Sequence, residues 1–439
     1  MTAFIAPLSA PQAADVGRFG PKAANLAALG HAGLPIPDGF CLDAAAYRLQ
    51  LSACGLNAAA QGAFGSDDPA HARRCALDMK LGLMERPIAS EVLEPLIAAY
   101  RVLAAKSGAP IVVRSSALVE DRYGSSFAGQ FESYLGLENE TDFLIAVRAC
   151  WAALWSTRAL RYMATHDIDP AGTAMAVLVQ PLVAAGAAGG ALSQTADGNM
   201  LINATPGLGS AIAQGEVTPD RYVLARDGAL QEVTARPAYH AVSCVHRPPS
   251  IRRARQAAPH RCLDDAQVAA LGHLLRRAEA VMGMAVEIEW ALDDSGIKLL
   301  QARPLHLQQE AANAVAEDWI RQPKLRGQPA GAGWASGPAC VVNCECELSR
   351  VAPGAVLVTK MAGPALSQVL AGVAGVVAEL GGSTSHLASL ARERGIPMVL
   401  GVADATSSIP DGSMVAVDGV SGIVRWMPHT IPLINAGRW

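Results

Sequence analysis

One histidine stands alone in the stretch ELGGSTSHLASLARERGIPMVLG, which spans residues 379–401. The apolar run just before the glycines, 373–380, is typical of a buried strand, and the two glycines permit a tight turn after it. The apolar spacing over 386–394 predicts a helix. His386 should therefore lie in the first turn of that helix, where free backbone N–H groups and the helix dipole favour bound phosphate.

His386 has two interpretations at this point. A single histidine most often only caps a helix or packs against its neighbours. The functional alternative is a nucleophile that carries a phosphoryl group beside the free N–H groups. The stretch offers no second histidine, cysteine pair or acidic cluster with metal-ligand spacing, so a metal site at His386 is not indicated.

A second group of chemically useful residues lies in VEIEWALDDSGIKLLQARP, residues 286–304. This segment predicts a β-hairpin that turns at DDSG. Strand alternation places Glu287 and Glu289 on one face, and Gln301 and Arg303 share a face on the returning strand. Carboxylates suit magnesium and arginine neutralises phosphate charge, so the hairpin fits a magnesium–triphosphate site. An exposed cross-strand ladder of ion pairs is the alternative.

Three further segments could bind phosphate, although each alone is weak evidence. Lys22 opens a predicted helix after a glycine turn and could reach a nucleotide phosphate. Arg114 ends an apolar strand, where its charge must project into a cleft or be paired. The small-residue loop SSFAGQ, 125–130, could close over phosphates, and the segment 203–222 supplies a second glycine loop.

Composition limits the class of protein. A chain of 439 residues is expected to form about two to four domains. With 51% hydrophobic and 17% charged residues, large buried cores are possible and disorder is not expected. The net charge of -4 and the lack of a basic stripe argue against nucleic acid as the main partner.

The sequence predicts a cytoplasmic protein. Its nine cysteines show no common metal-binding spacing and suggest thiols in a reducing compartment. The N-terminus shows no signal-peptide pattern. The uncharged stretch 174–192 contains proline and several glycines, so we interpret it as buried strands joined by a loop rather than a membrane helix.

Helical and strand patterns alternate along the first part of the chain, which predicts an α/β or α+β fold. The proline- and glycine-rich segment 308–333 predicts a linker, and a compact domain should follow over 334–439. The basic stretch 243–261 predicts a surface loop. Helices are expected at 22–32, 92–106, 142–166 and 264–282, and strands at 111–113, 175–180, 200–204, 286–292 and 298–301.

Taken together, five motifs resemble those of the phosphoenolpyruvate synthase and pyruvate phosphate dikinase family, which also includes rifampicin phosphotransferase. They occur in the family's order and cover both ends of the chain. They are GPKAANLAALGHAGLPIPDGF, VRSSALVEDRYGSSFAGQFES, GLGSAIAQGEVTPDRY, EIEWALDDSGIKLLQARP and GGSTSHLASLARERGIP.

The resemblance implies an ATP-grasp domain over 1–307 and a small swivelling β/β/α phosphohistidine domain. ATP would phosphorylate His386, and domain motion would carry the phosphoryl group to an acceptor, which explains why His386 lacks local partners. Arg303 would steady the transferring group, and Thr384 would hydrogen-bond the imidazole or its phosphate. Glu289 and Gln301 would hold Mg²⁺. The residues expected to bind nucleotide are Lys22, Arg114, Ser126, Gly129, Gln130, Gly207, Gly209 and Glu287.

The sequence departs from the family pattern in several places. Pro21 replaces the usual glycine before the lysine, and Ser210 replaces the usual glutamate after GLG. We expect no counterpart of the family's pyruvate-binding barrel or of its inserted drug-binding domain within these 439 residues. We therefore expect a dikinase-type phosphotransferase whose acceptor is a small molecule or is bound to a separate subunit. A carboxylate-activating ATP-grasp ligase and a non-catalytic nucleotide-binding subunit of a split synthase are the alternatives.

Overall fold

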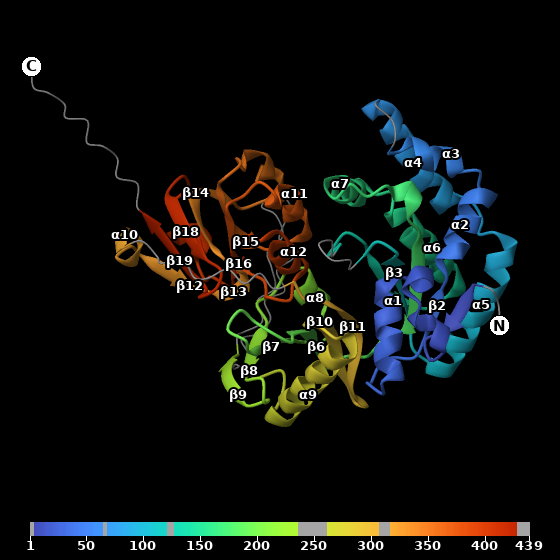
Figure 1. The fold of residues 1–439 in the computed structure, drawn as a ribbon, viewed down its shortest axis with the longest axis horizontal. Coiled ribbons are helices and arrows are strands. Elements are labelled where there is room, and N and C mark those ends of the chain that lie inside the picture. Colours follow the sequence, from blue (N-terminus) through green and yellow to red (C-terminus); the bar gives the residue numbers. More distant parts are fainter. Residues whose placement is uncertain (1–3, 65–67, 121–126, 236–260, 307–316, 428–439) are drawn as a thin grey trace, which may run out of the picture.

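The computed structural model describes residues 4–64, 68–120, 127–235, 261–306 and 317–427. These residues form three sheets that follow one another along the chain, and each sheet organises one lobe (Figure 1). We call them the first lobe, the second lobe and the histidine lobe. The mixed α/β architecture predicted from the sequence is confirmed.

The first lobe combines an antiparallel five-stranded sheet, in the order β1-β2-β5-β3-β4, with helices. Its strands are β1 (Ile5–Pro7), β2 (Phe40–Leu42), β3 (Ile111–Ala117), β4 (Ser133–Leu137) and β5 (Met175–Pro181). Its helices are α1 (Val16–His31), α2 (Ala44–Ala53), α3 (Asn57–Gly62), α4 (Pro69–Glu85), α5 (Ser90–Ser107), α6 (Glu140–Ala153) and α7 (Thr157–Thr165).

Helix α1 bends where the sequence predicted a glycine turn before Lys22. Gly20 has φ 71°, and a Cβ there would lie 2.3 Å from the backbone oxygen of Ser116 on β3. Only glycine permits both this backbone conformation and this close approach. The bend therefore sets Lys22 at the start of the regular part of α1, next to β3.

The single helix predicted over 142–166 is wrong, because the chain forms α6 and α7 instead. The side chain of Ser156 caps α7 by accepting a hydrogen bond from the Ala159 N–H. The stretch 140–165 is long and apolar enough to span a membrane by composition, yet it bends at this cap, and Phe143, Val147 and Trp151 are fully buried in the core. These helices therefore pack as core helices of the first lobe.

The second lobe is an antiparallel six-stranded sheet in the order β11-β10-β6-β7-β8-β9. Its strands are β6 (Ala187–Leu192), β7 (Met200–Pro206), β8 (Asp220–Leu224), β9 (Leu230–Thr234), β10 (Val286–Asp293) and β11 (Gly296–Pro304). Its helices are α8 (Ser210–Ala213) and α9 (Asp265–Met282). Helix α9 begins at a capping box made by Asp264 and Gln267 and packs Leu271 and Leu275 in the core of this lobe.

Two predictions for this region are confirmed. The uncharged stretch 174–192 contains β5 and β6 as buried strands. The segment 286–304 forms the hairpin β10–β11, which pairs Glu287 with Arg303 and Glu289 with Gln301. The predicted surface loop at 243–261 lies almost entirely outside the described residues.

The histidine lobe is an eight-stranded mixed sheet in the order β12-β19-β18-β14-β15-β16-β17-β13, with β14 to β17 parallel. Its strands are β12 (Lys324–Arg326), β13 (Gln328–Gly331), β14 (Trp334–Val342), β15 (Val356–Met361), β16 (Gly375–Leu380), β17 (Met398–Leu400), β18 (Met414–Asp418) and β19 (Ile423–Met427). Its helices are α10 (Glu317–Ile320), α11 (Ser367–Leu370), α12 (His386–Arg394) and α13 (Ala405–Ser408).

The linker predicted over 308–333 extends too far towards the C-terminus. Within it, β12 pairs with β19 and β13 pairs with β17, so both strands belong to the sheet of the histidine lobe. The glycine content that suggested a linker has a packing role here, because a Cβ at Gly327 would lie 2.4 Å from the Leu400 backbone oxygen. Residues 307–316 lie outside the described part of the chain.

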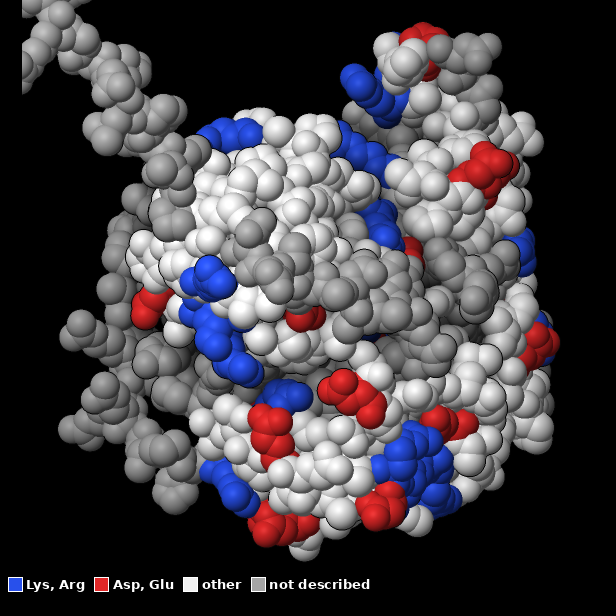
Figure 2. Space-filling model, turned by 60° about the vertical axis from the view of Figure 1, so that its left-hand side comes forward, with Lys and Arg blue, Asp and Glu red and all other residues white. Residues whose placement is uncertain are grey.

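Charged side chains are scattered over the face shown in Figure 2, where blue and red groups alternate. The described residues on this face form no continuous basic stripe. This distribution agrees with the small net charge of -4.

Candidate active site

His386 begins α12 directly after a glycine turn, as the sequence predicts. Gly381 takes φ 126°, and the Ser385 side chain caps the helix by accepting a hydrogen bond from the Ala388 N–H. Gly395 ends the helix in the left-handed conformation. The strand–turn–helix unit therefore places the half-buried His386 at the edge of its lobe, where it faces the other two.

A cavity of about 550 Å³ lies where the three lobes meet. Its lining includes Lys22, Arg114, Gly129, Gly209, Glu289, Gln301, Arg303, Thr384 and His386. These residues come from α1, β3, the segment before β4, the segment before α8, the β10–β11 hairpin and α12 with its preceding turn. The fold thus brings together nine of the site residues predicted from five separate motifs, and the partners that His386 lacks in its own sequence come from the other lobes.

Arg114 crosses from the first lobe to the hairpin of the second. Its Nη2 donates to Glu289 Oε2 at 2.8 Å and to Gln301 Oε1 at 2.7 Å, and its Nη1 donates to the Leu300 backbone oxygen at 2.6 Å. Two side-chain oxygens therefore converge on one positively charged nitrogen. Oxygen ligands that share one focus suit a hard cation, so Glu289 and Gln301 fit Mg²⁺ once the Arg114 guanidinium has moved aside.

Glu289 is held in its charged form. Burial opposes ionisation, but the charges of Arg114 and Arg303 and the hydrogen bond from Arg114 outweigh it, so the net effect is a lowered pKa. The carboxylate is therefore negative at neutral pH, as a magnesium ligand must be.

The imidazole of His386 is held in its neutral form. Burial lowers its pKa to about 4; Glu289 and Glu287 oppose this, while the charges of Arg303 and Lys22 add to it. Near neutral pH the ring therefore keeps a free nitrogen lone pair, which a nucleophile requires. The two cations beside it, Lys22 and Arg303, are suitably placed to attract an anionic ligand in the cavity.

Glu287 occupies a different place from the one predicted. It does not line the cavity but accepts from Arg303 at 2.9 Å and from Arg392 of α12 at 2.7 Å, and Ser389 donates to both of its oxygens. The net effect is a lowered pKa, because these neighbours outweigh burial. The Glu287–Arg303 pair of the predicted ladder exists, but it is buried and joins the second lobe to the histidine lobe.

Glycines allow the histidine lobe to pack closely on the other two lobes. A Cβ at Gly129 would lie 3.1 Å from His386 Nδ1, and a Cβ at Gly190 of β6 would lie 2.6 Å from the Thr384 Cβ. Asn203 of β7 donates from Nδ2 to Thr384 Oγ1 at 3.2 Å. Thr384 is therefore fixed by the second lobe, which adds an interlobe contact to the role predicted for it.

The remaining predicted residues lie at or near the cavity. Lys22 Nζ contacts the buried Glu120 carboxylate at 2.8 Å. Gln130 is buried and donates to the Ala128 backbone oxygen, and Gly207 has φ 74°; neither lines the cavity. Ser126 lies outside the described residues. Nucleotide binding by this set stays a prediction.

The sequence analysis missed the residues that fasten α12 to its surroundings. Ser389 and Glu393 follow His386 at spacings of three and seven, so all three share one face of the helix. A polar face on a helix that is expected to pack against a sheet indicates that the helix has polar partners. It does not indicate which lobe supplies those partners.

Two family models match the chain. Residues 16–323 match the pyruvate phosphate dikinase AMP/ATP-binding domain, and residues 351–422 match the mobile domain of PEP-utilising enzymes. The first match covers the first two lobes and the second covers most of the histidine lobe. The boundary between the two models falls close to the boundary between the sheets of the second lobe and the histidine lobe.

Curated relatives extend this similarity over 93% of the chain. A probable phosphoenolpyruvate synthase from Methanothermobacter thermautotrophicus is 32% identical, with 61% of its length covered. The phosphoenolpyruvate synthase of Pyrococcus furiosus is 29% identical, with 57% covered, and that of Pseudomonas aeruginosa is 30% identical, with 56% covered. The chain thus spans less than two thirds of these relatives, and it belongs to the phosphoenolpyruvate synthase and pyruvate phosphate dikinase family.

Proposed function

We propose that this protein is an ATP-dependent phosphotransferase of the dikinase type, which phosphorylates His386 and passes the phosphoryl group to an acceptor. The observation that carries the proposal is the position of His386 in one cavity with Lys22, Arg303 and Glu289. The two cations come from the lobes that match the ATP-binding model, and the histidine comes from the lobe that matches the mobile domain.

The proposed step is a nucleophilic displacement at phosphorus. A lone pair of the neutral imidazole attacks, a P–N bond forms, and the P–O bond to the nucleotide breaks with its electron pair kept by the leaving oxygen. Attack at the γ-phosphorus transfers one phosphoryl group and releases ADP. Attack at the β-phosphorus releases AMP and transfers a pyrophosphoryl group, whose γ-phosphoryl group must then pass to water as free phosphate to leave phosphohistidine. Nδ1 lies beside Gly129, so we assign the attack to Nε2.

The residues around His386 suit the charge that develops in such a step. Lys22 and Arg303 would stabilise the negative charge spread over the moving phosphoryl oxygens. Magnesium, held by Glu289 and Gln301, would neutralise part of the phosphate charge. Arg114 would release these two side chains and turn to the phosphates. Thr384, fixed by Asn203, would orient the imidazole or its phosphorylated form.

For the acceptor we propose only a chemical class. The curated relatives are named for the synthesis of phosphoenolpyruvate, which makes a small carbonyl acid a candidate acceptor. We propose that such an acceptor is bound either by this chain or by a separate subunit, and that the protein acts in the cytoplasm.

The test is to incubate the purified protein with magnesium and ATP labelled separately at the β and γ phosphates. We expect one label to appear on the protein in an acid-labile, base-stable form, with a matching amount of AMP or ADP. An acyl-phosphate or amide product without protein label would instead indicate a carboxylate-activating ligase. ATP that stays intact under all conditions would contradict the proposed activity.

Glu289→Ala should weaken the magnesium dependence of ATP consumption. Loss of a carboxylate that holds the metal should raise the magnesium concentration for half-maximal rate by about 10- to 100-fold or more, on the scale known for metal-site substitutions. A matched control is Glu232→Ala, which removes a glutamate paired with Arg221 at 2.9 Å near the far edge of the same sheet. Magnesium titrations of both variants, with thermal unfolding measured alongside, separate the metal effect from stability. An unchanged magnesium dependence would mean that Glu289 serves only its ion pair.

A further inference from the structure

A buried carboxylate on α12 is held by a helix of the first lobe. Glu393 lies two turns after His386, and its side chain is only 2% exposed. Tyr162 of α7 donates its hydroxyl proton to Glu393 Oε1 at 2.6 Å, and His166 Nε2 lies 3.3 Å from the same oxygen. In Figure 1, α7 reaches from the first lobe towards α12. The helix that carries His386 is therefore attached to α7 as well as to the second lobe.

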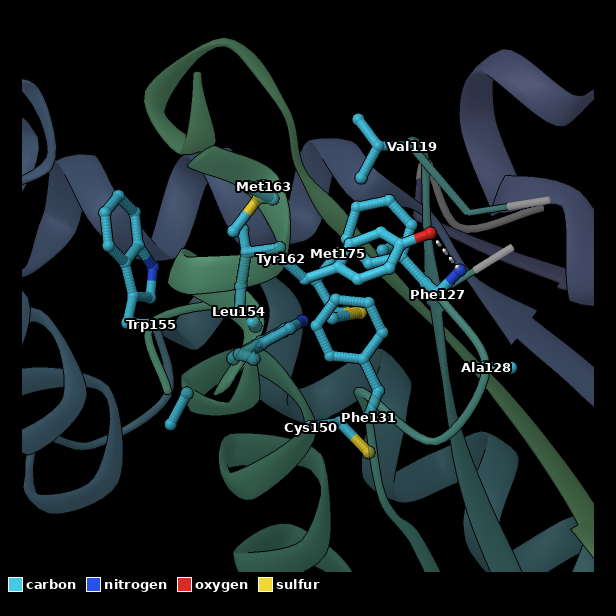
Figure 3. Packing of buried hydrophobic residues seen from close by; sticks show 14 of the residues in the cluster. Val119, Phe127, Ala128, Phe131, Cys150, Leu154, Trp155, Tyr162, Met163 and Met175 are labelled. Atoms are coloured by element: carbon cyan, nitrogen blue, oxygen red, sulfur yellow. Dashed lines mark hydrogen bonds between the residues drawn. The ribbon is translucent and has the colours of Figure 1, made fainter. Parts of the chain in front are cut away.

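The same tyrosine hydroxyl also binds the backbone of the loop 127–131, which contains Gly129. The Phe127 backbone N–H donates to Tyr162 Oη at 3.4 Å, shown as the dashed line in Figure 3. Burial raises the pKa of Tyr162, so the phenol keeps its proton at neutral pH. The hydroxyl can then use its proton for Glu393 and its lone pair for Phe127, so both contacts exist together.

Phe127 has an unusual backbone conformation that needs support. Its φ of 50° lies in the left-handed region, which non-glycine residues seldom adopt. Its ring stacks on Phe131 at 5.5 Å and packs against Tyr162 at 4.5 Å (Figure 3). Two residues later, Gly129 lies against His386 in the cavity. The conformation of the loop at 127–131 thus depends on Tyr162 at one end and meets His386 at the other.

We propose that Tyr162 is a positioning residue that couples the conformation of the loop 127–131 to docking of the histidine lobe, and this rests on the proposed function. When α12 docks, Glu393 accepts a hydrogen bond from the phenol and fixes the hydroxyl so that its lone pair points at the Phe127 N–H. The loop then holds the conformation that places Gly129 beside His386. Without α12, the hydroxyl is free to rotate and the strained Phe127 loses a partner.

The central variant is Tyr162→Phe, which removes one oxygen and keeps the ring that stacks on Phe127. The rate of His386 labelling from ATP in a single turnover should fall about tenfold, since a hydrogen bond to a charged group is lost at the docking interface. The dissociation constant for ATP should change less than twofold. Tyr100→Phe is the matched control, because Tyr100 is a buried tyrosine of the same lobe that stacks on Phe143, away from α12.

Two further measurements separate coupling from a purely structural role. Glu393→Ala, which also removes the His166 contact, should reduce labelling at least as much. Adding Tyr162→Phe to it should cost little more, because the contact between Tyr162 and Glu393 is already lost. Hydrogen exchange should become faster at both 127–131 and 386–394 in Tyr162→Phe. The proposal would be overturned if the reductions in labelling of the two single variants multiplied in the double variant. It would also be overturned if hydrogen exchange at 127–131 were unchanged in Tyr162→Phe.

The exchange measurement also separates this proposal from the proposed function. If wild-type protein takes no label on His386, the phosphotransfer proposal fails. Faster exchange in both segments of Tyr162→Phe would still support the coupling between loop and lobe. If wild-type protein is labelled and Tyr162→Phe is labelled at the same rate, the coupling fails while the phosphotransfer proposal stands.

Discussion

Replacing His386 with alanine should abolish the phosphoryl label on the protein while ATP binding is kept. The imidazole is the proposed attacking group, and no other histidine is found among the described residues that line the cavity. Removal of a covalent nucleophile commonly lowers turnover by about a thousandfold or more. The measurement is protein-bound label after incubation with labelled ATP and magnesium, with ATP affinity determined on the same preparation.

The control for this variant is His273→Ala, which removes an exposed histidine on α9. It should keep full labelling, since α9 packs on the far side of the second sheet from the hairpin residues in the cavity. Equal labelling of the His386→Ala and wild-type proteins would show that another group carries the phosphoryl, and the proposed mechanism would then be wrong.

The parts of the site that were predictable from sequence are local in the chain. A glycine turn before an amphipathic segment places His386 at a helix start whatever the rest of the fold does. The turn DDSG between two alternating runs predicts the hairpin, although a β-bulge between Glu289 and Trp290 shifts the register and so places Glu289 opposite Gln301. Each of these signals depends on backbone preferences within about 20 residues, and such preferences are readable in one sequence.

The parts that were not predictable depend on contacts between distant segments. The pairing of Arg392 with Glu287 and of Glu393 with Tyr162 follows from how the lobes dock, which no periodicity encodes. The same holds for the linker, where β13 is a strand only because β17 lies beside it. Apolar spacing ran unbroken through 142–166, whereas the Ser156 cap divides that stretch into α6 and α7.

Gly190→Ala should block docking of the histidine lobe and leave ATP binding intact. Gly190 lies on β6 between its partners Asn203 of β7 and Glu289 of β10. A methyl group there would lie 2.6 Å from Thr384 Cβ and 2.8 Å from Thr384 Oγ1. Thr384 has little room to retreat, because its hydroxyl is bound to Asn203. The contact therefore has to be relieved by moving the lobes apart.

The size of this effect follows from the cost of overpacking. An extra carbon forced into a close-packed contact costs about 1–3 kcal/mol. Since about 1.4 kcal/mol changes an equilibrium tenfold, the equilibrium constant for docking should fall by roughly 5- to 150-fold. His386 labelling in a single turnover should fall by up to the same factor, because the imidazole reaches the cavity only when its lobe is docked.

Gly186→Ala is the matched control for the docking variant. It adds the same methyl group just before the same strand, but its nearest neighbour, the Leu292 backbone oxygen, would lie 3.9 Å away. This variant should label at the wild-type rate. If Gly190→Ala also labels at that rate with unchanged ATP affinity, the docked arrangement of Thr384 against β6 is not the one in which the phosphoryl group is transferred. A slow Gly190→Ala beside a normal Gly186→Ala would instead tie the chemistry to this packing, because the two variants differ only in what the added methyl group meets.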